Sequence, residues 1–285
     1  MSVVVTIDMY SGRPNPTWEL SKTEAQKLRE LLQKDHEPTH LKSPAAAGHL
    51  GYRGIQISSV AESTPLSIAR VFDGVLETDQ TDAQNFVDGN SEIEEFLVGT
   101  AGLQLDGEEV TYIQQEIQKN VKGGAANTLR DIELFAVPPY DPGKWNNDPF
   151  IRRNNNCYNY SNDKITNTFA QPGRGSGQEG PYPPSCSGTG AASQRDGQRP
   201  ISNPDITPAQ GHIIALVVST TPGFLDYHWY RRDNNTMWSH KPGGTPATNR
   251  DNSGRTISDP RTCDRGPYNI FCGFYHCIPS ETRIR

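Results

Sequence analysis

One cysteine and two histidines in the second half of the chain have the residue types and the order that thiol chemistry requires. Cys157 follows an asparagine run at a point where a helix can begin, and the positive end of a helix dipole favours a thiolate. This position predicts a thiol pKa below the ordinary value of about 8.5. His228 is then the candidate general base, and His240, twelve residues later, is the candidate orienting residue.

Five further residues are predicted to bind substrate or to stabilise an oxyanion. Side-chain amides beside the cysteine are candidate oxyanion donors, and nearby aromatic side chains are candidates for lining a groove. The set is Asn155, Asn156, Tyr158, Trp229 and Trp238. Aromatic residues on strands more commonly belong to a core, so that alternative stays open for both tryptophans.

Purely structural roles also stay open for the proposed catalytic residues. An isolated cysteine is often an ordinary buried thiol, which is one interpretation of Cys157. A histidine in an aromatic strand is often a hydrogen-bonded core residue, which is one interpretation of His228. Asp226, Asp233 or an asparagine could orient the base in place of His240.

The elements that must position these residues are a helix and a hairpin. Residues 212–218 are uninterruptedly apolar, which is typical of a central strand covered on both faces. Residues 227–232 and 236–239 are predicted to be shorter strands around a polar turn. Antiparallel pairing of these two strands places residues 228 and 240 near one another. The helix that starts at Cys157 is expected to run to about Thr168.

The order of these elements resembles the NlpC/P60 branch of the papain-like superfamily over residues 145–243. The resemblance implies a papain-like α+β fold and a thiol peptidase or amidase. It also implies that Cys157 is the nucleophile, His228 the base and His240 the orienting residue. A peptide or peptidoglycan-like substrate, or a protein substrate, follows from the same kinship.

The chain departs from that family in three places. Asn156 stands where the family usually has an acidic residue, and Tyr158–Tyr160 stand where it has small and apolar residues. The long loops at residues 171–208 are foreign to a compact member.

A second resemblance supports a rival function from another class. Residues 238–249 and 251–254 are similar to uncharacterised bacterial and invertebrate proteins, some of them labelled as shell or extracellular matrix components. The rival is a non-enzymatic extracellular or matrix-type binding protein with a disulfide-stabilised C-terminal module.

The five cysteines all lie in the second half of the chain, and their odd number indicates at least one free thiol. If Cys186, Cys263, Cys272 and Cys277 pair, three connectivities are possible and the compartment is oxidising. A reduced cytosolic protein and a zinc site near His276 are alternatives, but the spacing lacks paired C-x2-C motifs. No metal or other cofactor is expected.

The turn-like segment at residues 251–254 admits two interpretations. Its oxygen-bearing side chains resemble the start of a calcium loop, but no glutamate stands at the end of an EF-hand-length loop. A hairpin turn is therefore favoured over a calcium site.

The first half of the chain is predicted to be a small α+β domain with a structural or recognition role. Ser21 and Glu24 form a capping-box pattern ahead of an amphipathic helix. Turn-forming residues at 137–143 mark a boundary, giving domains at residues 1–138 and 139–285. Strands are expected at residues 3–8, 54–60 and 67–76, and helices at residues 91–99 and 108–120.

Bulk composition excludes some classes of function. The net charge of −6 and the scattered basic residues make nucleic acid an unlikely partner class. Mean hydropathy is −0.69, and no run approaches the roughly 18 apolar residues of a membrane span. The first ten residues lack the pattern of a signal peptide, although the cysteine-rich C-terminal part suggests an extracellular location. The localisation is left open.

The sequence thus predicts an α+β protein of two domains, the second with long loops and a central antiparallel sheet. Its predicted function is thiol-dependent attack on an amide or peptide bond. His228 would accept the proton of the Cys157 thiol, and backbone and asparagine N–H groups would stabilise the oxyanion. Hydrolysis and transfer to an amine are not distinguished.

Overall fold

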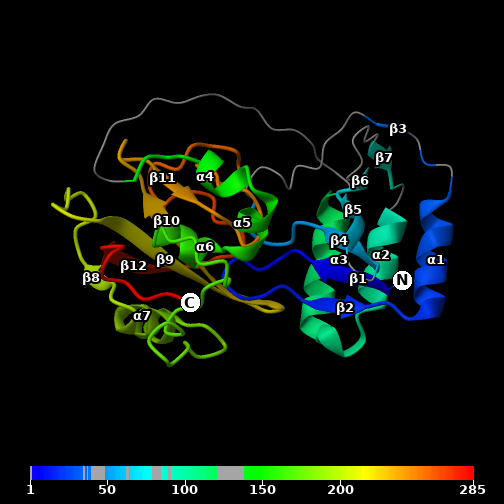
Figure 1. Cartoon of the computed structure of the whole chain (residues 1–285), viewed down its shortest axis with the longest axis horizontal. Coiled ribbons are helices and arrows are strands. Elements are labelled where there is room, and N and C mark those ends of the chain that lie inside the picture. The colour runs from blue at the N-terminus through cyan, green and yellow to red at the C-terminus, as the bar shows by residue number, and fades with distance from the viewer. Residues whose placement is uncertain are drawn as a thin grey trace. The chain divides into compact units, whose positions relative to one another are not determined.

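A computed structural model describes residues 2–34, 36, 38–39, 49–61, 64–78, 85–88, 91–120 and 138–285. The chain combines helices with two antiparallel sheets, which confirms the predicted α+β class (Figure 1). Among the described residues, no helix has both the length and the apolar character needed to cross a bilayer.

The chain divides into two compact units. The first consists of Met1–Met9, Asn15–Ala45 and Tyr52–Ala126, and the second of Tyr10–Pro14, Ala46–Gly51 and Asn127–Arg285. The second unit therefore includes two short segments from the N-terminal part of the chain. The domain boundary predicted at residues 138 and 139 stays a prediction.

The sheet of the first unit has the strand order β2-β1-β4-β5-β6-β7-β3, and each neighbouring pair is antiparallel. Asp73 and Gly74 have positive φ values of 53° and 68°, which suits a tight hairpin turn. They divide the strand predicted at residues 67–76 into β5 and β6. The strands are β1 (Ser2–Ile7), β2 (Thr17–Glu19), β3 (Pro38–Thr39), β4 (Ile55–Ala61), β5 (Thr64–Phe72), β6 (Val75–Thr78) and β7 (Asn85–Val87).

The helices of the first unit are α1 (Lys22–Leu32), α2 (Glu92–Gly99), the 3-10 turn η3 (Gly102–Gln104) and α3 (Gly107–Asn120). The predicted capping box is confirmed, since Ser21 Oγ accepts from Glu24 N and the Glu24 carboxylate accepts from Ser21 N. Apolar side chains of the helices and strands form the core, among them Val5, Ile7, Leu28, Leu31, Ile57, Val71, Ile93, Leu97, Ile113 and Ile117.

The sheet of the second unit has the strand order β11-β10-β9-β12-β8. The central strand β9 is buried over its first eight residues, as its apolar run predicts. The predicted strands at residues 212–218, 227–232 and 236–239 are found in β9 (His212–Thr221), β10 (Phe224–Arg232) and β11 (Trp238–His240). The sequence did not predict β8 (Arg199–Ile201) or β12 (Ile270–Cys277).

Within the described residues of this unit, four short helices accompany the sheet: α4 (Gly143–Asn146), α5 (Pro149–Asn154), α6 (Cys157–Ser161) and α7 (Cys186–Arg195). Helix α6 begins at Cys157 as predicted, but it ends at Ser161 rather than near Thr168 because Asp163 adopts a left-handed conformation with φ of 52°. Helix α7 lies within residues 171–208, which had been predicted to be loops. Figure 1 shows α6 beside β10.

Candidate functional site

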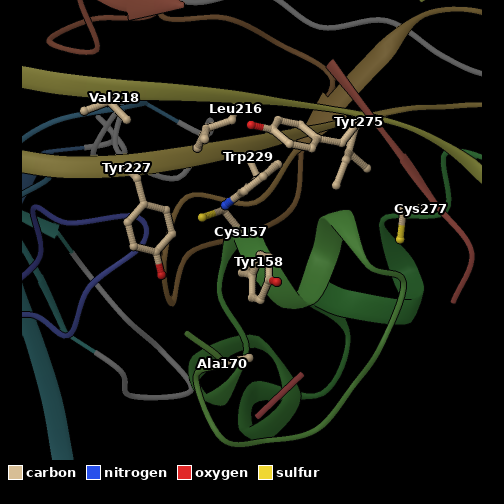
Figure 2. Close-up of a cluster of buried hydrophobic side chains, with 10 residues drawn as sticks. Cys157, Tyr158, Ala170, Leu216, Val218, Tyr227, Trp229, Tyr275 and Cys277 are labelled. Carbon is tan, nitrogen blue, oxygen red and sulfur yellow. The ribbon is translucent and has the colours of Figure 1, made fainter. Parts of the chain in front are cut away.

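Cys157 is buried at the start of α6. Asn156 is the N-cap of this helix, and its side-chain oxygen accepts from the backbone N–H groups of Tyr158 and Asn159. The cysteine side chain has no exposed surface and belongs to an apolar cluster between α6 and the sheet (Figure 2). Its neighbours in the cluster are Tyr158, Ala170, Ile214, Leu216, Val218, Tyr227, Trp229, Tyr275 and Cys277.

This environment reverses the expected ionisation of the thiol. Burial raises the pKa of Cys157 well above its ordinary value, and the nearby Asp226 carboxylate raises it further. Backbone hydrogen bonds at Trp229 and Tyr158 oppose the shift without cancelling it. A five-residue helix supplies only a small dipole, so the loss of hydration dominates. The predicted low pKa is therefore wrong, and Cys157 is a neutral thiol at neutral pH.

The expected proximity of the two histidines is confirmed. His228 Nε2 lies 2.8 Å from His240 Nδ1, and His240 Nε2 lies 2.8 Å from the carbonyl oxygen of Arg250. A carbonyl only accepts, so His240 carries its proton on Nε2 and accepts at Nδ1 from His228 Nε2–H. Both rings are buried, and Tyr230 stacks on His240 with ring centroids 5.1 Å apart.

Cys157 and His228 occupy opposite faces of the sheet. Cys157 packs with Tyr227 and Trp229, as Figure 2 shows. Successive side chains on a strand point to opposite faces, so His228 projects to the other face, where it contacts His240 and Tyr268. The structure brings the two histidines together, but the cysteine belongs to a different cluster.

The amide of Asn155 is committed to the local fold. Its nitrogen donates to Ile151 O and Asn167 Oδ1, and its oxygen accepts from the backbone N–H groups of Thr166 and Asn167. This side chain holds the end of α5 against the loop that follows α6. Its amide N–H groups are engaged in the fold and are not directed at an open groove.

The amide of Asn156 is likewise engaged. Its oxygen caps α6, and its nitrogen donates to the carbonyl oxygens of Gly12 and Ala170 at 2.9 Å and 2.8 Å. Asn159 completes a capping box by accepting from Asn156 N. The two predicted oxyanion donors therefore act as helix caps and loop anchors.

The three aromatic residues predicted to contact substrate are core residues. Tyr158 and Trp229 have no exposed surface and Trp238 retains 4%. The Tyr158 hydroxyl donates to Asp196 Oδ2 at 2.8 Å, while Trp238 packs against Phe274. The alternative of a strand core, which the sequence left open for both tryptophans, agrees with this burial.

The structure has one disulfide, whereas the sequence allowed up to two. Cys186 and Cys272 form a disulfide, whereas Cys157, Cys263 and Cys277 are free thiols. Within the described part of the chain, no group of three or more His, Cys, Asp or Glu side chains is placed to hold a metal ion.

Residues 251–254 form the favoured hairpin turn. The backbone N–H of Gly254 donates to Asp251 O, and Asp251 N donates to Arg255 O. The Asp251 carboxylate accepts from the backbone N–H groups of Ser253, Arg255 and Asp264. Its oxygens are thus used by backbone N–H groups of the turn and of Asp264.

The sequence did not predict the structural role of Asp226, whose carboxylate accepts several hydrogen bonds inside the second unit. Its buried carboxylate accepts from the backbone N–H groups of Ser11, Gly12 and Arg13 and from the Tyr268 hydroxyl. Burial raises the pKa of Asp226, and these hydrogen bonds oppose that shift. The signal in the sequence was an acidic residue near the start of an aromatic strand. The three backbone groups that it binds, at Ser11, Gly12 and Arg13, lie more than 200 residues away along the chain.

Comparison with known proteins gives one informative relative. No family model matches the chain, and no solved structure is significantly similar to it. The chain is similar to insoluble matrix shell protein 1 of Ruditapes philippinarum, with 52% identity over 136 residues. The aligned region covers 47% of this chain and 86% of that relative.

This relative overturns the predicted enzyme. By name it is a shell matrix protein and not a peptidase, so the assignment to the NlpC/P60 branch is wrong. The thiol hydrolase or acyl transferase function, with its cysteine protease and amidase chemistry, is wrong for the same reason. The rival interpretation, a matrix-type binding protein, agrees better with the relative.

Proposed function

Because the chain belongs to the family of insoluble matrix shell protein 1, we propose that it is a non-enzymatic structural component of an extracellular matrix. The observation that carries this proposal is the 52% identity, which extends over 86% of that relative. Its partners in the matrix are other protein chains.

The disulfide supports an extracellular site of action. Disulfides persist in oxidising compartments and are rare in the reducing cytosol. The bond between Cys186 and Cys272 closes a separation of 86 residues and ties α7 to β12. A covalent tie of this length suits a protein that must remain folded without cellular maintenance.

The condition of the free thiols supports a non-catalytic role. Burial raises the pKa of Cys263 to about 11 and that of Cys277 to about 12, in each case as the largest cause. Cys157 is shifted in the same direction. Thiolate is the reactive form, so none of these three cysteines is activated as a nucleophile.

Fractionation of the source tissue tests the matrix role. An antibody against the purified chain is used to probe soluble cell lysate, soluble extracellular fluid and the insoluble extracellular fraction. We expect most of the protein in the insoluble extracellular fraction. Recovery of most of the protein from soluble cytosol contradicts the proposal.

Alkylation of the native protein tests the absence of an activated thiol. Iodoacetamide is applied at neutral pH and the labelled positions are identified by mass spectrometry. We expect Cys157, Cys263 and Cys277 to label at least roughly 100-fold more slowly than free cysteine. The urea-unfolded chain is the control, in which all three label quickly. Fast native labelling of any of the three cysteines contradicts the absence of an activated thiol.

A further inference from the structure

The segment Tyr10–Pro14 is held in the second unit as a peptide is held by a receptor. We define the slot as the five residues that surround its middle: Asn156, Gln171, Asp226, Tyr227 and Tyr268. One Asp226 carboxylate accepts three successive backbone N–H groups of the segment, at 2.6 Å from Ser11, 3.1 Å from Gly12 and 3.1 Å from Arg13. Tyr268 fixes the same carboxylate by donating to it at 2.5 Å.

The slot also recognises the carbonyl group of Gly12. Asn156 Nδ2 and Gln171 Nε2 donate to this oxygen at 2.9 Å and 2.7 Å. The Tyr227 hydroxyl lies 3.1 Å from the same oxygen and 2.8 Å from Gln171 Oε1, and its single proton serves one acceptor at a time. Donors and acceptors of the backbone are thus matched on both sides of the segment.

The side chains of the segment are selected as well. A Cβ atom on Gly12 would lie 2.6 Å from two ring atoms and the carbonyl oxygen of Tyr227, so glycine is required. The Arg13 guanidinium lies 4.0 Å from the ring centroid of Tyr10 and 4.5 Å from that of Tyr182. It also donates to the Tyr182 hydroxyl at 2.8 Å and to Leu225 O at 3.0 Å.

We propose that this slot also takes the Tyr10–Pro14 segment of a second copy of the chain, joining copies by exchange of an identical element. Every copy carries both the slot and its ligand, which is the condition for such exchange. Along the sequence the segment lies between Met1–Met9 and Asn15–Ala45, which are assigned to the first unit, whereas the slot belongs to the second. A copy that gives its segment to one neighbour keeps a vacant slot for another.

This arrangement is head-to-tail, so it can continue into open chains of copies. The protein partner in the proposed matrix is then another copy of the same chain. The inference rests on the proposed matrix function for its biological purpose. The joint is tested with purified protein. Failure of the joint with purified protein does not change the expected result of the tissue fractionation. Failure of the fractionation likewise does not change the expected result for the joint.

Two complementary variants of the full-length chain test the joint. Gly12→Val damages the segment and leaves the slot intact, whereas Asp226→Ala damages the slot and leaves the segment intact. Each variant alone, and an equimolar mixture, is refolded from urea with the disulfide oxidised. Size-exclusion chromatography with light scattering then measures the mass. We expect each variant alone to be monomeric and the mixture to give a one-to-one complex at twice the 31.5 kDa mass of one chain.

The wild-type chain, refolded at rising concentration, should give masses that increase beyond two copies, because its joints are not limited to one. A mixture that stays monomeric overturns the proposal, as does self-association of either variant to the same extent as the mixture. If Gly12→Val fails to fold by circular dichroism, Arg13→Ala and Tyr182→Ala replace the pair. Arg13→Ala removes the guanidinium from the segment, and Tyr182→Ala removes one of the groups that the guanidinium contacts.

Discussion

Cys186 and Cys272 join the first residue of α7 to the extra residue of a β-bulge in β12. In the pairing with β9, Phe271 lies opposite Val217 and Gly273 lies opposite Leu216, so Cys272 has no partner in the ladder. A bulge re-aims the side chain of its extra residue. Here the re-aimed side chain is the one that reaches α7.

Loss of this disulfide should lower stability strongly. The double variant Cys186→Ser, Cys272→Ser is expected to lose about 4 kcal/mol of unfolding free energy, because an 86-residue separation is no longer constrained in the unfolded chain. Urea unfolding measures the loss. Cys263→Ser, which removes a partly exposed free thiol, is the control and should change stability by less than about 1 kcal/mol. Equal effects of the two changes would exclude a role for the bond.

Glu94 should make the first unit less stable as pH rises. Burial, as the largest cause, raises the pKa of this carboxyl from 4.5 to about 7, and its partner at 2.6 Å is the Tyr52 hydroxyl. The folded state binds the proton more tightly than the unfolded state, so its stabilisation is complete below pH 4.5 and is lost as pH rises through 7. The loss amounts to about 3 kcal/mol at most.

Urea unfolding of wild type and Glu94→Gln across this pH range measures the effect. The difference between the two proteins isolates Glu94 from other buried carboxyl groups that also titrate. Glu95→Gln changes an exposed neighbour on the same helix and is the matched control. A constant difference between wild type and Glu94→Gln at all pH values would show that this carboxyl does not titrate as expected.

Lys241 should be among the least replaceable residues of the second unit. Its buried ammonium donates to the carbonyl oxygens of Asn155, Arg152 and Gly243 at 2.5 Å, 2.6 Å and 2.7 Å. Lys241→Met leaves these acceptors without that donor and should cost about 3 kcal/mol or more in chemical unfolding. Lys144→Met, which breaks a partly exposed ion pair with Asp163, should cost less than about 1 kcal/mol. A tolerated Lys241→Met would mean that water replaces the ammonium.

His212 should remain neutral in mildly acidic solution. Burial, as the first cause, and the charge of Arg231 lower its pKa from 6.5 to about 4. Its stabilising effect is present above pH 6.5 and is lost as pH falls through 4, because the unfolded chain takes up the proton more readily. NMR of the ring carbon–proton signals at pH 5.5 should show neutral imidazole in the folded chain and imidazolium in the urea-unfolded chain. A protonated folded signal at that pH contradicts the burial argument.

Local patterns in the sequence predicted local structure well. The Ser21 and Glu24 pair, the apolar run of β9 and the polar turn between β10 and β11 each depend on nearby residues. The turn was also sufficient to place His228 beside His240, because the register of a short hairpin is set by its loop. Helix α7 was missed because its Gly and Ser residues have poor helix propensity, while tertiary contacts and the disulfide hold it in place.

The predicted contact between Cys157 and His228 depends on long-range packing, which local sequence patterns do not determine. The order of Cys157 and His228 along the chain said nothing about which face of β10 would meet α6. A shift of one residue decides between Tyr227 and His228, and the packing of the whole second unit selects Tyr227. The role of Asp226 was equally hidden, since the backbone donors Ser11, Gly12 and Arg13 lie more than 200 residues before it in the sequence.

The hydrogen bonds of the asparagine side chains around α6 affect how fast these residues deamidate. Asparagine deamidates when the backbone nitrogen of the next residue attacks the side-chain carbonyl carbon, which requires a mobile side chain. Asn155, Asn156 and Asn159 are buried, and each uses both ends of its amide in hydrogen bonds. Material that is deposited and never renewed accumulates such damage for as long as it lasts. In this chain Asn155, Asn156 and Asn159 are held in a way that slows that reaction.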